Sequence, residues 1–139
     1  MNLTQLVAYV RAHGDGVVST VGPNGAPQGS YVAVAATEGG ELIFNARSTS
    51  RKVENVRRDA RAALTIGGGD GTTLQCQGIA ELLEGGELAR CADAYYTTFP
   101  QFARSTAGDI AFVRVRLEWA RFGQYVGGVF ESNDVGLTS

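Results

Sequence analysis

The sequence predicts a mainly β fold, in which about six or seven mostly antiparallel strands and two or three inserted helices form a closed or half-closed barrel. Glycine is unusually frequent, at 19 of 139 residues, and this favours tight turns over long helices. Short segments rich in β-branched residues alternate with turn signals along most of the chain. Helical spacing of apolar residues is confined to a few short segments.

The first half of the chain is expected to contain a helix followed by three strands. Apolar residues recur with helical spacing over residues 3–13, and Gly14 follows as a C-cap. The predicted strands are residues 17–21, 28–36 and 41–46. Turn signals separate them at residues 22–25 and 37–40.

The second half begins with a short helix over residues 49–58, for which Ser48 or Thr49 can be the N-cap. Gly78 marks a bend in a long strand. The other predicted elements are strands at 62–66, 72–83, 109–117 and 119–126 and a helix at 87–97. We expect one domain spanning residues 1–139, of which residues 127–139 are a tail.

Charge and hydropathy patterning exclude several classes of protein. The net charge of −2 gives no electrostatic reason to expect binding to nucleic acid or to an anionic membrane. The N-terminal residues have neither the basic start nor the apolar run of a secretory signal. No segment approaches the ~18 apolar residues that a membrane helix needs. We therefore expect a cytoplasmic protein.

The metal-ligating residue types are few and scattered. Cys76 and Cys91 form no Cys-x-x-Cys pair, and the single histidine, His13, is far from both in the sequence. A structural zinc site needs about four ligands, so none is expected. Two reduced cysteines are the favoured interpretation in a cytosolic protein, although spacing alone leaves a disulfide open.

The segment Asn45-Ala46-Arg47-Ser48-Thr49-Ser50-Arg51-Lys52 concentrates three hydroxyl groups and three cations between a strand end and a helix start. The first turn of a helix exposes backbone N–H groups and a partial positive charge, which suit a phosphate. Cations in that turn oppose the helix dipole, and a bound anion would remove the conflict. Local chemistry alone fits a phosphate site and a solvated basic helix face equally well.

The surrounding order of hairpins shifts this balance. Ser50-Arg51-Lys52, followed by the Asn-x-x-x-Asp-x-Arg-x-Ala-Leu pattern of residues 55–64, resembles the pyridoxamine 5'-phosphate oxidase-like family. The resemblance runs from about Val17 to Leu83 and is weaker from Glu84 onward. It implies an FMN-binding split β-barrel.

The resemblance also implies a role for each matching residue. Arg51 and Lys52, with Ser50 beside them, would hold the flavin phosphate. A first strand would run along the flavin ring and ribityl chain with Ser30, Tyr31 and Val32. A second strand would contact the flavin through Asn45 and Ala46, by backbone groups or the Asn45 amide.

A further implied contact crosses between subunits. Members of the family are generally homodimers with the flavin at the interface, and we expect this chain to follow them. Thr73 stands where the family often has a glutamine that reaches the phosphate held by the partner. Threonine is shorter than glutamine, so this contact would be weaker or missing.

The C-terminal part departs from the family's namesake enzymes. These carry an Arg-x-His that binds substrate, whereas this chain has Ala120-Arg121-Phe122-Gly123 in that region. We therefore expect an FMN-dependent oxidoreductase of unknown substrate, with no catalytic residue identified. The alternatives are a deazaflavin-dependent reductase, a non-catalytic flavin-binding or storage protein, and a haem-handling relative in which His13 could ligate iron.

Overall fold

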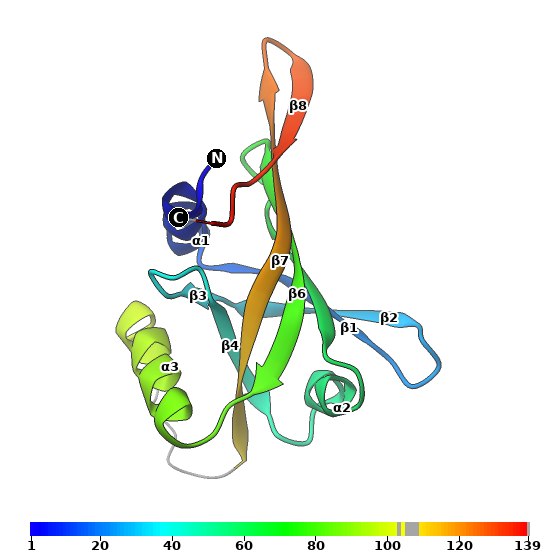
Figure 1. Ribbon diagram of the computed structural model, residues 1–139, viewed down its shortest axis with the longest axis vertical. Helices are drawn as coiled ribbons and strands as arrows, with labels where there is room; N and C mark the ends of the chain where they lie inside the picture. Colours follow the sequence, from blue (N-terminus) through cyan, green and yellow to red (C-terminus); the bar gives the residue numbers. More distant parts are fainter. Residues whose placement is uncertain (103, 105–108, 139) are drawn as a thin grey trace.

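The computed structural model describes residues 1–102, 104 and 109–138. This part of the chain forms eight strands and three helices, which Figure 1 shows arranged around one curled sheet. In chain order they are α1 (Leu3–His13), β1 (Asp15–Val21), β2 (Pro27–Ala33), β3 (Ala35–Ala36), β4 (Leu42–Arg47), α2 (Arg51–Arg58), β5 (Arg61–Gly67), β6 (Thr72–Leu82), α3 (Gly85–Thr98), β7 (Ile110–Val126) and β8 (Val129–Asp134).

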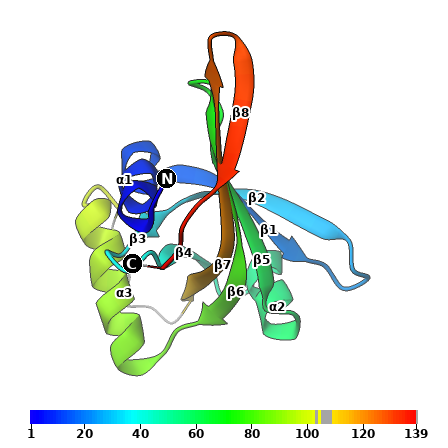
Figure 2. The same ribbon diagram turned by 45° about the horizontal axis from the view of Figure 1, so that its top comes forward.

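The sheet is antiparallel throughout, with the order β2-β1-β5-β6-β7-β4-β3. The 17-residue strand β7 organises it. One edge of β7 pairs with β6, while the other edge pairs first with β4 and then with β8. The hairpins β1–β2 and β7–β8 project from the curled sheet (Figures 1 and 2). The predicted half-closed barrel with inserted helices, a split β-barrel, is confirmed.

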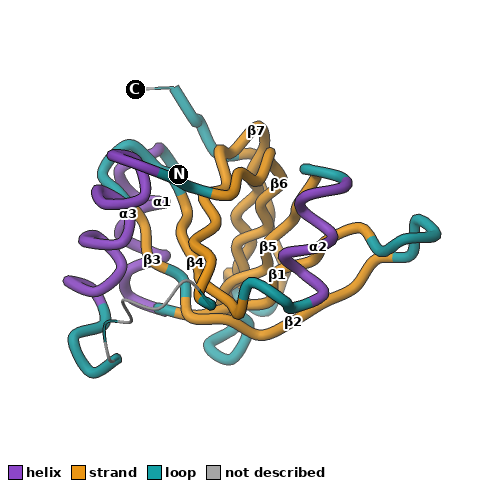
Figure 3. The backbone as a smooth tube through the Cα atoms, turned by 90° about the horizontal axis from the view of Figure 1, so that it is seen from below, coloured by secondary structure: helices purple, strands orange, loops and turns teal. Residues whose placement is uncertain are grey.

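The helices lie on two sides of the strands. In Figure 3, α2 is on the side opposite to α1 and α3. The larger hydrophobic core lies inside the curl of the sheet, where Leu6, Val10 and Val56 of the helices meet strand residues such as Phe44 and Leu64. A second core joins α3 to β3, β4 and β7.

Helix α1 forms as its sequence predicts. Asn2 and Gln5 make a reciprocal capping box, in which each side chain accepts a hydrogen bond from the other's backbone N–H at 2.9 Å. Gly14 ends the helix in the left-handed conformation, with φ of 76°, and its N–H donates to the Val10 carbonyl.

The bend predicted at Gly78 is also present. The pairing of β6 with β7 shifts register between Gln77 and Gly78. A Cβ atom at Gly78 would lie 2.1 Å from the Arg116 carbonyl oxygen, so only glycine lets the two backbones approach this closely.

Four expectations need correction. The predicted strand over 28–36 is interrupted at Val34 and forms β2 and β3. The strands predicted at 109–117 and 119–126 are one continuous strand, β7. Residues 127–139 are not a tail, because 129–134 form β8. The strand total is therefore eight in the described part of the chain, and not six or seven.

The missed strand has a clear physical cause. Gly127 and Gly128, which read as the end of the fold, have φ of 58° and 83° and form the tight turn of a hairpin. Beyond β8, Val135 is buried in the core, and Gly136 bridges to Asn2 beside the N-terminus.

The start of α2 also differs from the prediction. The helix begins at Arg51 and its N-cap is Ser50, so neither Ser48 nor Thr49 caps it. A tight turn precedes it, in which the Ser50 N–H donates to the Arg47 carbonyl at 2.9 Å.

Cys76 and Cys91 are buried and unbridged, which settles the disulfide alternative. Among the described residues, no helix has the length and apolar character to cross a membrane.

Candidate functional site

A cleft of about 370 Å³ lies where β1 and β2 face the first turns of α2. It brings together three of the predicted site residues, Ser30, Arg51 and Lys52. The remaining lining residues are Thr20, Gln28, Gly29 and Asn55. Strand β2 thus supplies one wall, and the N-terminal end of α2 supplies the other.

The N-terminal end of α2 is suited to an anion. Ser50 caps it with extended backbone angles, but its side chain makes no capping hydrogen bond. The Ser50 Oγ is buried and has no hydrogen-bond partner among the described residues. The first backbone N–H groups of a helix lack intrahelical acceptors and carry partial positive charge. Ser50 therefore adds an unsatisfied hydroxyl to a site that already has unsatisfied donors.

The cations of this segment are unlike the others in the chain. Of the twelve lysines and arginines, three have side chains that make no hydrogen bond or ion pair to any described residue: Arg47, Arg51 and Lys52. The other nine each donate to a carboxylate or another oxygen atom: Arg11, Arg57, Arg58, Arg61, Arg90, Arg104, Arg114, Arg116 and Arg121. Two of the three unpartnered cations line the cleft, and Arg47 lies outside its lining.

Asn55 fixes the floor of the cleft. Its side chain is 2% exposed, and its amide donates to Thr20 Oγ1 at 3.0 Å and to Gln28 Oε1 at 2.9 Å. Its own oxygen accepts from Arg58 at 2.9 Å. This network ties α2 to β1 and β2 and so holds the first turn of the helix against the strand that forms the other wall.

Sequence reasoning missed Thr20, Gln28, Gly29 and Asn55 as lining residues. Asn55 carried a usable signal, because it is the first residue of the Asn-x-x-x-Asp-x-Arg-x-Ala-Leu pattern, and it is buried in α2 together with Val53 and Val56. An asparagine on a buried helix face needs hydrogen-bond partners from neighbouring elements. Nothing comparable in the sequence distinguishes Thr20 or Gln28.

The predicted ring-side strand divides its residues between two faces. Val32 packs against the larger core, and Ser30 lines the cleft. Tyr31 points the other way, is 69% exposed, and donates its hydroxyl to Asp15 Oδ1 at 2.7 Å. That hydrogen bond raises the pKa of Tyr31. Tyr31 is not part of the cleft lining, so its predicted flavin contact stays a prediction.

Asn45 and Ala46 lie on β4, outside the cleft lining. The Asn45 side chain faces α3, where its oxygen accepts a hydrogen bond from the Tyr95 hydroxyl at 3.4 Å. Within one chain the structure does not bring either residue to Arg51 and Lys52. Flavin contacts by these two residues stay predictions.

Thr73 lies at the start of β6, at the end of the sheet away from α2 (Figure 1). It lines a small separate hollow with Gln75, Arg121 and Phe130. In a single chain it cannot meet a phosphate at α2, so its expected role depends on a second subunit and stays a prediction.

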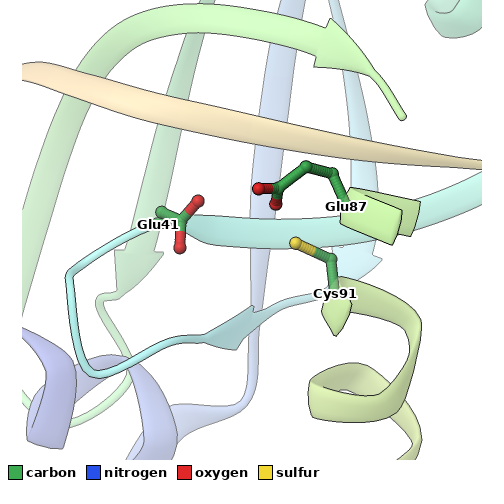
Figure 4. Close-up of side chains that lie close together, drawn as sticks. All are labelled: Glu41, Glu87 and Cys91. Carbon is green, nitrogen blue, oxygen red and sulfur yellow. The ribbon is translucent and has the colours of Figure 1, made fainter. Parts of the chain in front are cut away.

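A cluster of carboxylates and a thiol lies between α3 and the sheet. Figure 4 shows the side chains of Glu41, Glu87 and Cys91 close together. Their possible ligand atoms all lie within 4.8 Å of one another. Both carboxylates are already ion-paired, because Glu41 and Glu87 accept hydrogen bonds from Arg90 and Arg114 at 2.7–3.1 Å. A metal ion here would have to displace both guanidinium groups.

This arrangement is an ion-pair network that fastens α3 to the sheet. Arg114 is 3% exposed, and Arg90 lowers the pKa of Glu41 by hydrogen bonding to it. Burial raises the pKa of the neighbouring Cys91 thiol, which behaves as a small hydrophobic group. We therefore assign the cluster to stability of the fold.

The aromatic residues near the end of α3 are likewise structural. Tyr95 contacts Tyr96, Phe99 and Phe112 edge-on, with ring centroids 5.0–5.5 Å apart. Burial raises the pKa of Tyr95 to about 12. Tyr95, Tyr96, Phe99 and Phe112 are buried in the second core, so they pack within the fold.

The geometry agrees with a comparison to known families. The family model for pyridoxamine 5'-phosphate oxidase matches residues 3–123. The chain belongs to this family. The match extends well beyond the segment on which the sequence resemblance rested, and it includes α3 and most of β7. No curated protein was found to match the sequence.

Solved structures show the same fold at low sequence identity. A heme binding protein from Mycobacterium smegmatis is 22% identical, with a TM-score of 0.74 over 95% of this chain, which spans 57% of that protein. An F420 reductase is 18% identical, with a TM-score of 0.66 over 81% of this chain and 93% of the other. General Stress Protein 26 from Bacillus anthracis is 14% identical, with a TM-score of 0.70 over 93% and 97%. At these identities the likeness shows the fold alone.

Within the pyridoxamine 5'-phosphate oxidase family, the chain lacks the namesake's substrate-binding Arg-x-His. The corresponding region is part of β7, where Arg121 donates to Ser132 Oγ and to Asp134 Oδ1, both at 3.0 Å. Arg121 is thus engaged by β8.

Proposed function

We propose that the protein binds FMN, with its phosphate at the N-terminal end of α2, and acts as an FMN-dependent oxidoreductase of unknown substrate. Arg51 and Lys52 both line one cleft, and Ser50, the N-cap of the same helix, has a buried hydroxyl without a partner among the described residues, although it lies outside the cleft lining; together these features support the proposal. A phosphate at the start of α2 would pair with both cations and with the exposed N–H groups of the helix. A solvated basic face would not require a buried serine oxygen without a partner.

The residues present fit the rest of the cofactor's polar chain. Ser30 offers a hydroxyl group on the opposite wall of the cleft. The side-chain oxygen of Gln28 accepts a hydrogen bond from Asn55, and its amide nitrogen has no partner among the described residues. When bound, the flavin would supply the redox chemistry, and the protein would bind and orient it. No residue of the lining is an acid or a histidine, so we name no proton donor or acceptor.

The structure favours FMN over the two other cofactors. A deazaflavin of the F420 type carries a long anionic tail, and the cleft lining holds no cation beyond Arg51 and Lys52. Haem commonly takes a histidine ligand. Both ring nitrogens of His13, the sole histidine, already face acceptors, the Tyr9 carbonyl and Asp70.

We further propose a homodimer in which the second subunit completes the flavin site. Apolar side chains remain exposed on the sheet, where Val17 and Tyr31 are register partners at 37% and 69% exposure. The tip of the β7–β8 hairpin is also apolar, with Tyr125 and Val129 at 64% and 63%. Exposed apolar surface of this kind is typical of association sites. Size-exclusion chromatography with light scattering measures the mass of the protein in solution. A monomer with FMN bound would contradict this part of the proposal.

The absorbance spectrum of the purified protein tests the proposal. We expect flavin bands as isolated or after addition of FMN, whereas a Soret band would indicate haem. Bleaching of the flavin by a reduced nicotinamide nucleotide, followed by recovery in air, distinguishes an oxidoreductase from a storage protein. A colourless protein that takes up no added FMN contradicts the proposal.

A further inference from the structure

A group of side chains that the proposed flavin site does not use connects α1 to the loop between β5 and β6. The loop, residues 67–71, contains four glycines around Asp70. His13, the last residue of α1, has its Nε2 3.0 Å from Asp70 Oδ2 and its Nδ1 2.9 Å from the Tyr9 carbonyl oxygen. The His13 and Tyr9 rings are stacked with centroids 4.0 Å apart. The imidazole is therefore held on both ring nitrogens and on one face.

We infer that His13 and Asp70 form a pH-dependent clasp that fastens the glycine loop to helix α1 when the imidazole is protonated. Both atoms facing the ring nitrogens are acceptors, a backbone carbonyl and a carboxylate. A neutral imidazole has only one N–H to donate. Only the imidazolium can satisfy both acceptors, so loss of the proton breaks one of the two bonds.

The carboxylate side of the clasp is fixed independently of the histidine. Asp70 Oδ1 accepts hydrogen bonds from the Thr72 hydroxyl at 2.6 Å and from the Thr72 N–H at 3.0 Å. The Thr72 hydroxyl also lies 2.7 Å from the Tyr9 hydroxyl. The bonds from Thr72, together with the bond to His13, hold the pKa of Asp70 well below its usual range, so the carboxylate stays charged while the imidazole titrates.

The acceptor atoms and carboxylates around the imidazole favour its charged form, and partial burial opposes it. The charged or titratable groups that face it are Asp70 from the loop, Asp15 from β1 and Tyr9 from its own helix. The pKa of His13 is raised above its ordinary value, first by the bond to the Tyr9 carbonyl and then by the two aspartates. The clasp is therefore complete below about pH 6.5 and is lost as the pH rises through the higher pKa of the folded protein.

Apart from the clasp, the loop is held by the Gly68 N–H bond to the Thr72 carbonyl and by the Asp70–Thr72 bonds, and the tip itself makes few contacts. Gly67, Gly68 and Gly71 have positive φ, and positions 68 and 69 have no heavy atom within 4 Å of where a Cβ would lie. With the imidazole neutral, the Asp70–Thr72 bonds still shape the loop, but the tie to α1 through His13 is weakened, because a neutral imidazole can keep only one of its two bonds. We expect the loop amides to exchange faster in that state.

The single histidine makes a direct test possible. NMR of the imidazole in the intact protein follows one titrating group, and we expect both ring nitrogens to be protonated in the clasped state. Asp70→Asn should lower the His13 pKa. The control Asp59→Asn removes an aspartate that pairs with Arg61 and does not face His13, and it should leave the titration unchanged. A His13 pKa that does not respond to Asp70→Asn overturns the proposal.

Hydrogen exchange tests the consequence for the loop. After correction for intrinsic rates, protection of the amides of residues 68–71 should fall about two- to five-fold as the pH rises through the His13 titration. His13→Gln keeps the Asp70–Thr72 bonds and should remove this step. A step that persists in His13→Gln, or no step in the wild-type protein, contradicts the clasp. These readouts involve no flavin, so failure of the flavin proposal leaves them unaffected.

Discussion

The side-chain amide of Asn55 donates to the Thr20 hydroxyl across 3.0 Å, and both side chains are buried, at 2% and 3% exposure. This bond joins a helix to a strand 35 residues earlier in the chain. With the second bond to Gln28, it sets the distance between the two walls of the cleft. The geometry of the proposed phosphate site therefore depends on buried hydrogen bonds between uncharged side chains.

Replacement of Asn55 should lower the stability of the folded protein. Asn55→Ala leaves the Thr20 hydroxyl and one Arg58 N–H without their partner, so the free energy of unfolding should fall by about 1–3 kcal/mol. Urea denaturation measures the change. Asn133→Ala, the same substitution at an exposed position, is the control and should alter stability by less than about 0.5 kcal/mol. Equal effects of the two substitutions would show that the buried network contributes nothing.

The cations at the start of α2 should recognise the phosphate specifically. Arg51→Ala or Lys52→Ala should each weaken FMN binding by about 1.5–3 kcal/mol, because each removes a charge-assisted contact. Riboflavin lacks the phosphate, so its affinity should barely change. Fluorescence quenching of the two ligands gives both affinities under the same conditions.

A matched control comes from the same helix. Arg57 is also an exposed arginine of α2, but it pairs with Glu54 and does not line the cleft. Arg57→Ala should leave both affinities unchanged. If FMN and riboflavin lose affinity equally in Arg51→Ala, the phosphate does not bind at this helix.

The fold was largely predictable because its signals are local. Helical spacing with Gly14 identified α1, and Gly78 identified the bulge in β6 from one residue. The failures came where a local signal has two meanings. A Gly-Gly pair is compatible both with the end of the folded region and with the turn of a hairpin. The pairing of β8 with β7 shows that Gly127-Gly128 is a hairpin turn.

The candidate site was predictable only in part. Arg51 and Lys52 stood out because cations in the first turn of a helix oppose its dipole. The position of Ser50 depends on where the helix starts, which sequence places to within a few residues at best. Thr20 and Gln28 join the site through side-chain contacts with Asn55, and such pairings between distant segments leave no pattern in a single sequence.

Arg114 should be the most sensitive position of the α3 ion-pair network. It is 3% exposed and donates to Glu41, Glu81 and Glu87 at 2.9–3.1 Å. Arg114→Met should lower the free energy of unfolding by about 3 kcal/mol. This is the low end of the range for a broken buried ion pair, because Glu81 and Glu87 remain partly exposed to water. Arg116→Met is the control, because Arg116 is exposed and, within the described part of the chain, forms an ion pair with Glu81 alone. Its cost should be about 0–1 kcal/mol, and chemical denaturation measures both.

The same network predicts how stability depends on acid. Hydrogen bonds from the arginines lower the pKa values of Glu41, Glu81 and Glu87 below 4.5 in the folded protein. Groups of this kind contribute stability above their unfolded pKa, and they lose it as the pH falls through the folded pKa. The stability difference between the wild-type protein and Arg114→Met should therefore be constant above about pH 5 and shrink toward more acidic pH. Denaturation midpoints at a series of pH values test this, and a difference that does not change with pH would mean that Arg114 stabilises the fold by packing rather than by ion pairing.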